Sequence, residues 1–171
     1  MYVGIPCKFI SPIEGFSAFG KVTYEKGCSE IKCPDDKLIK SAVDVAKNAD
    51  ATFLFVGLDL SVEAEWVDRR DLLLPGYQTH LINEVAEASK GPVILIVMTA
   101  GVVDISVAKI NPKIQSILWV GYPGEQGGRA IAEVAFGKYN PGNCHFFLVG
   151  PSYSPYNFFF SNLCLLCMHF L

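Results

Sequence analysis

The chain has 171 residues, of which 51% are hydrophobic, and this apolar content is enough for the core of one globular domain and no more. The formal net charge is −3 and the lysines and arginines are scattered along the chain, so no nucleic-acid partner is expected. The segment from Met1 to Pro6 lacks the basic start, the apolar run and the small-residue cleavage site of a secretory signal, and none is expected here.

Short apolar runs alternate with amphipathic segments along the chain. The amphipathic segments carry apolar residues at helical spacing, as at Leu38, Ala42 and Ala46, whereas the runs at 51–58, 92–98 and 116–120 are almost entirely apolar. Unbroken apolar strands separated by helices predict an α/β fold, a three-layer α/β/α sandwich around a mostly parallel sheet. Strands are expected at 21–25, 51–58, 92–98 and 116–120, and helices at about 35–49, 76–89 and 127–136.

Several carboxylates lie in the segment that follows the apolar run at 51–58. In open α/β sheets, ligands bind in the crevice beyond the carboxyl ends of the strands, which is where these side chains are expected. Glycosidic bonds are cleaved by a pair of carboxyl groups, but a solvated loop with Arg69 and Arg70 as counter-ions fits the spacing equally well. The carboxylates are Asp59, Glu63, Glu65 and Asp68.

The sequence of this segment adds information that its spacing does not. Glu63-Ala-Glu65 with Asp68-Arg69, followed by Leu-Pro-Gly-Tyr-Gln at 74–78, resembles the segment that carries the acid/base glutamate in glycoside hydrolase family three. The likeness is strongest to the plant β-xylosidase/α-arabinofuranosidase branch, and it covers residues 1–142 as a partial C-terminal α/β domain. Further stretches that are similar, in the same order, lie at 7–12, 24–28, 91–95, 104–109, 119–124 and 136–142.

The resemblance implies a role for each residue of the motif. Glu63 falls on the position of the acid/base, and Glu65 is the second candidate or a neighbour that tunes its proton affinity. Trp66 is placed to stack on a sugar ring, although a hydrophobic anchor for the loop is an equally good interpretation. Asp68 and Arg69 are expected to form an ion pair that supports the loop.

The function implied is that of a retaining, exo-acting β-xylosidase, with α-arabinofuranosidase activity also known in this branch, acting on xylo- or arabino-oligosaccharides in the cell wall. No cofactor and no metal are implied. The family's nucleophilic aspartate lies in a (β/α)8 barrel that has no counterpart in this chain, so the isolated chain is expected to be inactive. The alternative is a catalytically silent sugar-binding or interaction module that remains after loss of the barrel.

A glycine cluster at 121–128 invites comparison with phosphate-binding loops, because it joins a predicted strand to a predicted helix. It matches neither of the common nucleotide-binding motifs and contains no lysine. Turn geometry and close packing explain the glycines sufficiently, so a nucleotide-binding regulatory domain is the weakest of the three functional classes.

The two ends of the chain depart from the family pattern. The family domain begins with a strand upstream of the Cys7 motif, and its loss would leave a gap in the middle of the sheet. Residues 143–171 form a divergent apolar tail, as expected of a truncated or aberrantly spliced product, in which His145–Val149 has strand character and could fill that gap. Pro151 and Pro155 interrupt the tail, so a membrane span is not expected.

The cysteines lie in two groups. By the resemblance to secreted enzymes, a disulfide is expected between Cys28 and Cys33, or from either of them to Cys7. The C-terminal pair Cys164 and Cys167 has the spacing of zinc ligands, but its spacer is apolar and no second pair stands at a suitable distance.

Overall fold

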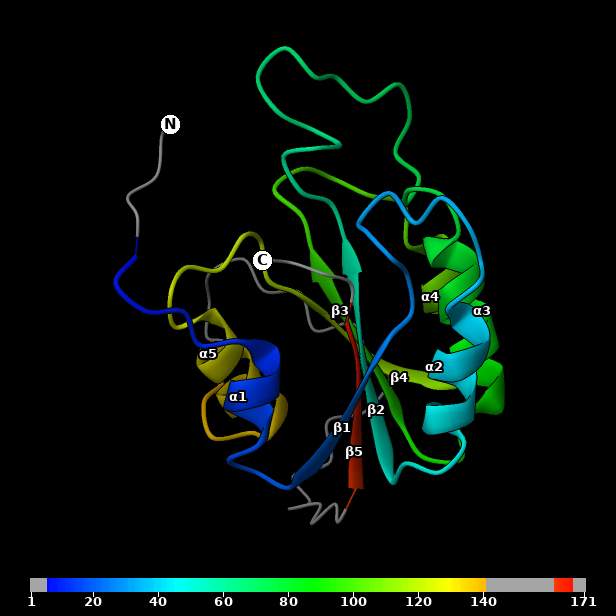
Figure 1. Cartoon of the computed structure of the whole chain (residues 1–171), viewed down its shortest axis with the longest axis vertical. Helices are drawn as coiled ribbons and strands as arrows, with labels where there is room; N and C mark the ends of the chain where they lie inside the picture. The colour runs from blue at the N-terminus through cyan, green and yellow to red at the C-terminus, as the bar shows by residue number, and fades with distance from the viewer. Residues whose placement is uncertain (1–5, 141–161, 168–171) are drawn as a thin grey trace.

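The computed structural model describes residues 6–140 and the backbone of residues 162–167. In this part of the chain five parallel strands form one sheet, and helices cover both of its faces (Figure 1). The strands are β1 (Lys21–Lys26), β2 (Ala51–Gly57), β3 (Val93–Met98), β4 (Ile114–Trp119) and β5 (Asn162–Cys167). The helices are α1 (Pro12–Phe16), α2 (Ile39–Ala46), α3 (Gln78–Ala88), α4 (Ser106–Ile110) and α5 (Gly127–Ala135).

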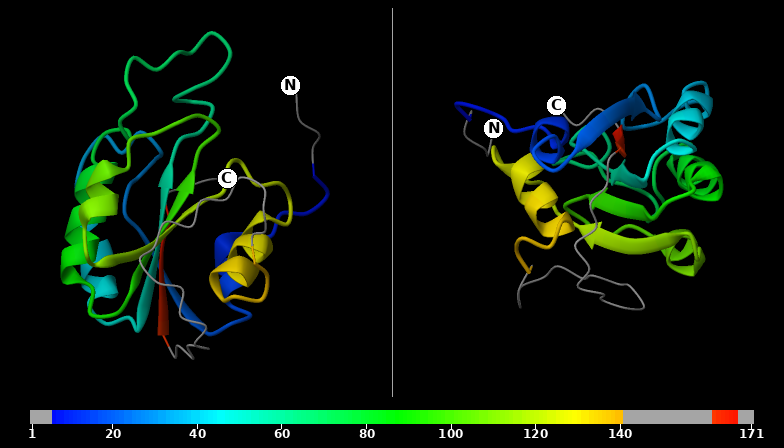
Figure 2. Two further views of the ribbon diagram at one scale, coloured as in Figure 1. Left: turned by 180° about the vertical axis from the view of Figure 1, so that it is seen from behind. Right: turned by 90° about the horizontal axis from the view of Figure 1, so that it is seen from below.

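The three layers are clear in the side and end views (Figure 2). Helices α2, α3 and α4 lie on one face of the sheet, and α1 and α5 lie on the other. Because successive side chains of a strand point to opposite faces, β2 contributes to two cores. Phe53 and Phe55 pack with Phe16 of α1, whereas Leu54 and Val56 pack with α2 and α3. The predicted α/β fold with a mostly parallel sheet is therefore confirmed.

The order of the strands in the sheet is β1-β5-β2-β3-β4. Strand β5, the last in the chain, therefore lies between the first two, and it is parallel to both of them. Asn162 pairs with Lys21 of β1, and Leu163 pairs with Ala51 of β2. The tail thus supplies a strand to the sheet, as anticipated, but from a segment that had not been predicted. The predicted segment His145–Val149 lies outside the described residues.

Most predicted elements are present with shifted ends. The helix expected from residue 35 begins only at Ile39, because the Asp35 carboxylate accepts the backbone N–H of Lys37 and closes a turn before it. The helix expected from residue 76 begins at Gln78, because Gly76 has a φ of 51°, a left-handed conformation outside the helix. Helices α1 and α4 have five residues each and had not been predicted.

Candidate active site

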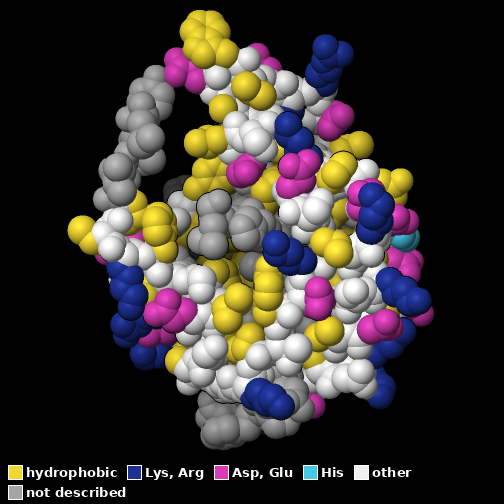
Figure 3. Space-filling view, in the orientation of Figure 1, with side chains coloured by type: hydrophobic (Ala, Val, Ile, Leu, Met, Phe, Trp, Pro, Cys, Tyr) yellow, Lys and Arg dark blue, Asp and Glu magenta, His cyan; other side chains and the backbone are white. Residues whose placement is uncertain are grey.

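The carboxylate motif lies in the long loop from residue 58 to residue 77, which joins β2 to α3 and projects beyond the carboxyl end of the sheet (Figure 1). Hydrophobic and acidic side chains gather over this loop at the top of the space-filling view (Figure 3). The loop begins at Gly57, whose φ of 147° is accessible to glycine and rarely to other residues. A side chain there would also clash with the Met98 carbonyl group of β3.

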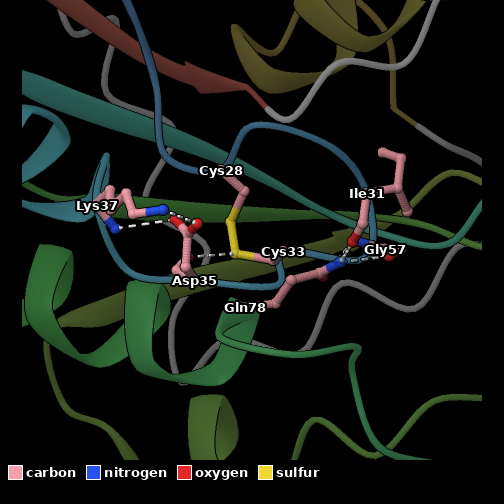
Figure 4. The surroundings of a disulfide bond; sticks show 7 residues. All are labelled: Cys28, Ile31, Cys33, Asp35, Lys37, Gly57 and Gln78. Atoms are coloured by element: carbon pink, nitrogen blue, oxygen red, sulfur yellow. Dashed lines mark hydrogen bonds and ion pairs between the residues drawn. A yellow bond between two sulfur atoms is a disulfide. The ribbon is translucent and has the colours of Figure 1, made fainter.

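The side chain of Gln78 holds the two ends of this loop together (Figure 4). It is fully buried, accepts the N–H of Gly57 at 3.0 Å and donates to the Gly57 carbonyl at 2.8 Å. Its amide also donates to the carbonyl of Ile31 at 2.7 Å. The start of the loop, its end and the segment after β1 are therefore joined at one buried amide.

The segment after β1 is closed by a disulfide between Cys28 and Cys33, both of them buried (Figure 4). This is the first of the pairings that the sequence left open, and the Cys7 thiol is exposed and unpaired. The Cys33 carbonyl accepts the N–H of Tyr77, which is the last residue before α3. The disulfide loop is thus part of the support on which the carboxylate loop rests.

Glu63 is held by Arg69 within the loop. The Arg69 Nε donates to Glu63 Oε2 at 2.8 Å, and Arg69 Nη2 donates to the carbonyl of Val102, in the loop after β3, at 2.7 Å. Arg69 has 11% of its side chain exposed and Glu63 has 37%, so the pair lies at the boundary of the protein and solvent. Glu63 is therefore oriented by a largely buried arginine but open to a ligand.

The structure corrects the ion pair expected between Asp68 and Arg69. Among the described residues, Arg69 pairs with Glu63, and Asp68 stays exposed. The guanidinium is fixed by its hydrogen bond to the Val102 carbonyl, and in this position its Nε donates to Glu63. Arg69 thus supports the loop by bonding directly to Glu63, the acid/base candidate.

The second glutamate and the tryptophan occupy the tip of the loop. Ala64 and Val67 exchange two backbone hydrogen bonds, of 3.0 Å and 2.9 Å, which makes Glu65 and Trp66 the two central residues of a tight turn. Trp66 has a φ of 69°, unusual for a bulky residue, and 93% of its surface is exposed. An anchor buried in this part of the chain is thereby excluded, and Trp66 remains available to a ligand or another domain.

Tyr122, which lies after β4, is a polar neighbour of the Glu63–Arg69 pair that sequence reasoning did not single out. Partial burial raises the pKa of its phenol, and the carboxylates of Glu63 and Asp59 raise it further, against the lowering effects of a hydrogen bond with the Ala100 backbone and of Arg69. The loops after β2, β3 and β4 therefore meet at one site. The sequence predicted the position of the loop after β2 at this edge of the sheet, but not which side chains meet there.

Among the described residues, no cluster of three or more His, Cys, Asp or Glu side chains has the arrangement of a metal site. The side chains of Cys164 and Cys167 lie outside the described atoms, so the structure does not test whether these two cysteines bind zinc. No helix in the described ranges is both long enough and apolar enough to cross a bilayer.

A doubly wound sheet with carboxylates on the loop after a central strand is a common scaffold for enzymes that act on small polar ligands. Comparison with known proteins narrows the class: residues 3–143 match the glycosyl hydrolase family 3 C-terminal domain. The chain belongs to this family.

The relatives found are much longer than this chain. It is 55% identical over 140 residues to "Beta-xylosidase/alpha-L-arabinofuranosidase 1" of Medicago sativa subsp. varia, and 46% identical over 141 residues to "Beta-D-xylosidase 1" of Arabidopsis thaliana. Each match covers 82% of this chain but 18% of the relative.

Solved structures agree with the sequence comparison. A GH3 exo-β-xylosidase in complex with a xylobiose aziridine activity-based probe matches with a TM-score of 0.76 and 35% identity, covering 81% of this chain and 18% of that one. A GH3 β-glucosidase of Bifidobacterium adolescentis matches with a TM-score of 0.68 and 32% identity, covering 78% and 20% of the two chains.

Proposed function

We propose that this chain acts as the C-terminal domain of a retaining, exo-acting β-xylosidase, in which Glu63 is the acid/base. The observation that carries the proposal is the position of Glu63: its carboxylate is oriented by a largely buried arginine yet open to solvent, where three loops meet. The names of the relatives support a pentose as the sugar removed, with arabinose as a second substrate.

In this mechanism, Glu63 gives its proton to the glycosidic oxygen while a carboxylate of a separate barrel domain attacks the anomeric carbon. The glycosidic C–O bond breaks, and a covalent sugar ester of the nucleophile forms. Glu63, now ionised, then takes a proton from the water that hydrolyses this ester. The residues described here supply the acid and its orientation, whereas the nucleophile is proposed to come from the barrel.

Trp66 and Glu65 have different roles in this proposal. Trp66, exposed at the tip of the turn, would stack on a sugar ring or pack against the barrel domain. Glu65 lies in the same exposed turn, whereas the Arg69 guanidinium donates to the carboxylate of Glu63. We therefore assign the proton transfer to Glu63 and not to Glu65.

A chimera tests this assignment. Residues 3–143 of this chain replace the matching stretch of the Medicago relative, and kcat/KM is measured for aryl xylosides with good and poor leaving groups. Glu63→Gln is expected to lower kcat/KM for the poor leaving group by about 10²–10⁴-fold, and to spare the good one, which departs without a proton. Glu65→Gln is the matched control, and the assignment fails if the two variants exchange these results.

The rival is a sugar-binding module without activity, which the exposed Trp66 would also suit. Isothermal titration of the 171-residue chain with xylotriose addresses it. The proposal expects neither turnover of an aryl xyloside nor measurable binding by the isolated chain, since most subsite contacts would come from the barrel. Binding that is lost in Trp66→Ala, together with an inactive chimera, would favour the rival.

A further inference from the structure

Gly101, in the loop after β3, lies directly against the carboxylate of Glu63. A Cβ atom added at Gly101 would be 3.0 Å from Glu63 Oε2, 3.1 Å from Glu63 Oε1 and 3.3 Å from Arg69 Nη2. The φ of Gly101 is outside the left-handed region, so the backbone itself does not require glycine there. What requires glycine is the space that the glutamate and arginine occupy.

The loop that carries Gly101 is fixed from the sheet. The Thr99 hydroxyl donates to the Gly101 carbonyl at 2.8 Å, and the Trp119 indole N–H lies 2.9 Å from the Thr99 Oγ1 and 3.0 Å from its carbonyl oxygen. Thr99 is fully buried at the end of β3, and Trp119 is the last residue of β4. Because these bonds hold Gly101 in place, an added methyl group would displace the glutamate and not the loop.

Arg69 fixes the other side of the carboxylate. Its guanidinium spans from Glu63 to the carbonyl of Val102, the residue next to Gly101, and also reaches the Asp71 carbonyl at 3.4 Å. The arginine therefore holds the carboxylate of Glu63 by a hydrogen bond, beside the space that Gly101 leaves open. Both constraints act on Oε2 of the same carboxylate.

We propose that Gly101 and Arg69 are positioning residues for proton transfer by Glu63: the missing side chain of Gly101 sets how closely the carboxylate approaches the β3–α4 loop, and Arg69 holds it there. This inference rests on the proposed function of Glu63. Contacts of 3.0–3.3 Å require the neighbouring atoms to give way by a few tenths of an ångström. A glutamate side chain can do so without unfolding the protein, so the fold tolerates Gly101→Ala while the position of the acid changes.

The chain offers a matched control at Gly124, in the loop after β4. A Cβ atom added there meets nothing within 4 Å, and its φ is also outside the left-handed region. Gly124→Ala therefore makes the same chemical change at the same edge of the sheet without touching Glu63 or Arg69.

The first measurement uses the 171-residue chain labelled with ¹³C at the glutamate carboxyl groups. The Glu63 resonance is assigned by its absence in Glu63→Gln. Gly101→Ala is expected to shift this resonance and to weaken the signal of the Arg69 Nε–H, whereas Gly124→Ala leaves both unchanged. An unchanged Glu63 resonance in folded Gly101→Ala protein would overturn the proposed contact whatever the function of Glu63.

The second measurement uses the Medicago chimera and the ratio of kcat/KM for poor and good leaving groups. A variant that only lowers the folded fraction changes both values equally, so this ratio reports the acid alone. Gly101→Ala is expected to lower the ratio by about tenfold, since misplacement by 1 Å costs about 10²-fold and the shift here is smaller. Arg69→Met is expected to lower it as well, with partial recovery in Arg69→Lys.

The outcomes separate the two proposals. If Glu63→Gln leaves the ratio unchanged, the proposed function of Glu63 is wrong. If Glu63→Gln lowers the ratio but Gly101→Ala behaves like Gly124→Ala, the function stands and the positioning role of Gly101 is wrong.

Discussion

At the scale of single residues, the site depends on contacts between positions that are distant in sequence. Gln78 joins Gly57 and Ile31, and Arg69 joins Glu63 and Val102. In both cases one planar, multidentate side chain lies where two loops meet and donates hydrogen bonds to oxygen atoms of both. The carboxylate of Glu63 is thus held in position by hydrogen bonds that reach beyond its own loop.

Gln78 gives the first prediction. Replacing it by methionine leaves the N–H and carbonyl of Gly57 and the carbonyl of Ile31 buried without their partner, so the free energy of unfolding should fall by about 3 kcal/mol. Gln115, exposed in β4, is the matched control, and its methionine variant should stay within about 0.5 kcal/mol of the parent. Urea denaturation measures both, and equal effects would contradict the role given to Gln78.

Tyr122 gives the second prediction. Its pKa is raised first by burial and also by the carboxylates of Glu63 and Asp59, so it should ionise above the ordinary pH range of a tyrosine. Because the folded state binds the proton more tightly, stability should decline as the pH rises above the ordinary tyrosine pKa of about 10, and Tyr122→Phe should remove that part of the decline.

The same phenol reports on the site. Glu63→Gln removes one of the negative charges that oppose the phenolate, so it should lower the pKa of Tyr122. Tyrosine Cζ resonances followed by NMR against pH measure this shift, with Glu65→Gln as the control. A Tyr122 pKa that is insensitive to Glu63→Gln would show that the two groups do not face each other as described.

At the scale of elements, α5 ends in a cluster of charges. The Glu133 carboxylate accepts a hydrogen bond from Lys138 Nζ at 2.7 Å and one from Arg129 Nε at 3.1 Å. Both bonds lower the pKa of Glu133, and the bond from Lys138 has the larger effect. Beside this cluster, Phe136 stacks on Phe19 with ring centroids 4.4 Å apart. The ion pairs of Glu133 therefore link the last turns of α5 to the segment that follows it.

The third prediction concerns Glu133. A carboxyl group whose pKa is lowered by folding stabilises the fold above its unfolded pKa of about 4.3, and loses that contribution as the pH falls through the folded value. Glu133→Gln should therefore melt at lower temperature than the parent at pH 7, and the difference should shrink under acid conditions. Glu87→Gln, at an exposed position of α3, is the matched control, and equal effects of the two substitutions would contradict this role of Glu133.

The elements that could be predicted from the sequence are those with enough residues to show a period. Strand β2 is buried at every position and α3 has eleven residues, so both are recognisable without a structure. Helices α1 and α4 are too short for this, at five residues each.

The site was predictable only in part. The motif around Glu63 predicted the loop and, by resemblance, the residue that we propose as the acid. The partners of Glu63 were not recognised, because Gly101 and Tyr122 come from other loops and glycine carries no chemical signal. Arg69 was assigned to its sequence neighbour Asp68, although the fold brings it to Glu63. Contacts of this kind follow from the order of the strands in the sheet, which local sequence patterns do not specify.

At the scale of the whole molecule, β5 connects two parts of the sheet that share no strand pairing. Strand β1 pairs with β5, and β2 pairs with β5 and β3, so without β5 the sheet would divide between β1 and β2. Two rows of backbone donors and acceptors would then lose their partners in the interior of the protein. The fold therefore depends on a segment in the apolar tail.

The fourth prediction tests this dependence. Leu165 is a central residue of β5, paired with Tyr24 on one side and Phe53 on the other. Leu165→Pro removes a backbone N–H and fixes φ in a central strand, so it should abolish cooperative melting or lower the midpoint strongly. Leu165→Val keeps strand propensity and is the control. Equal melting curves for the two variants would show that β5 is dispensable.

The place of β5 in the chain also governs when the sheet can be completed during synthesis. Strands β1 and β2 leave the ribosome about a hundred residues before the strand that separates them, because β2 ends at Gly57 and β5 begins at Asn162. At typical rates of translation this is a delay of roughly 5–20 s. Throughout that interval the edges of β1 and β2 that β5 will occupy have no partner strand. Correct folding of the nascent protein therefore requires that no other extended chain, including one from a neighbouring ribosome, pairs with these edges first.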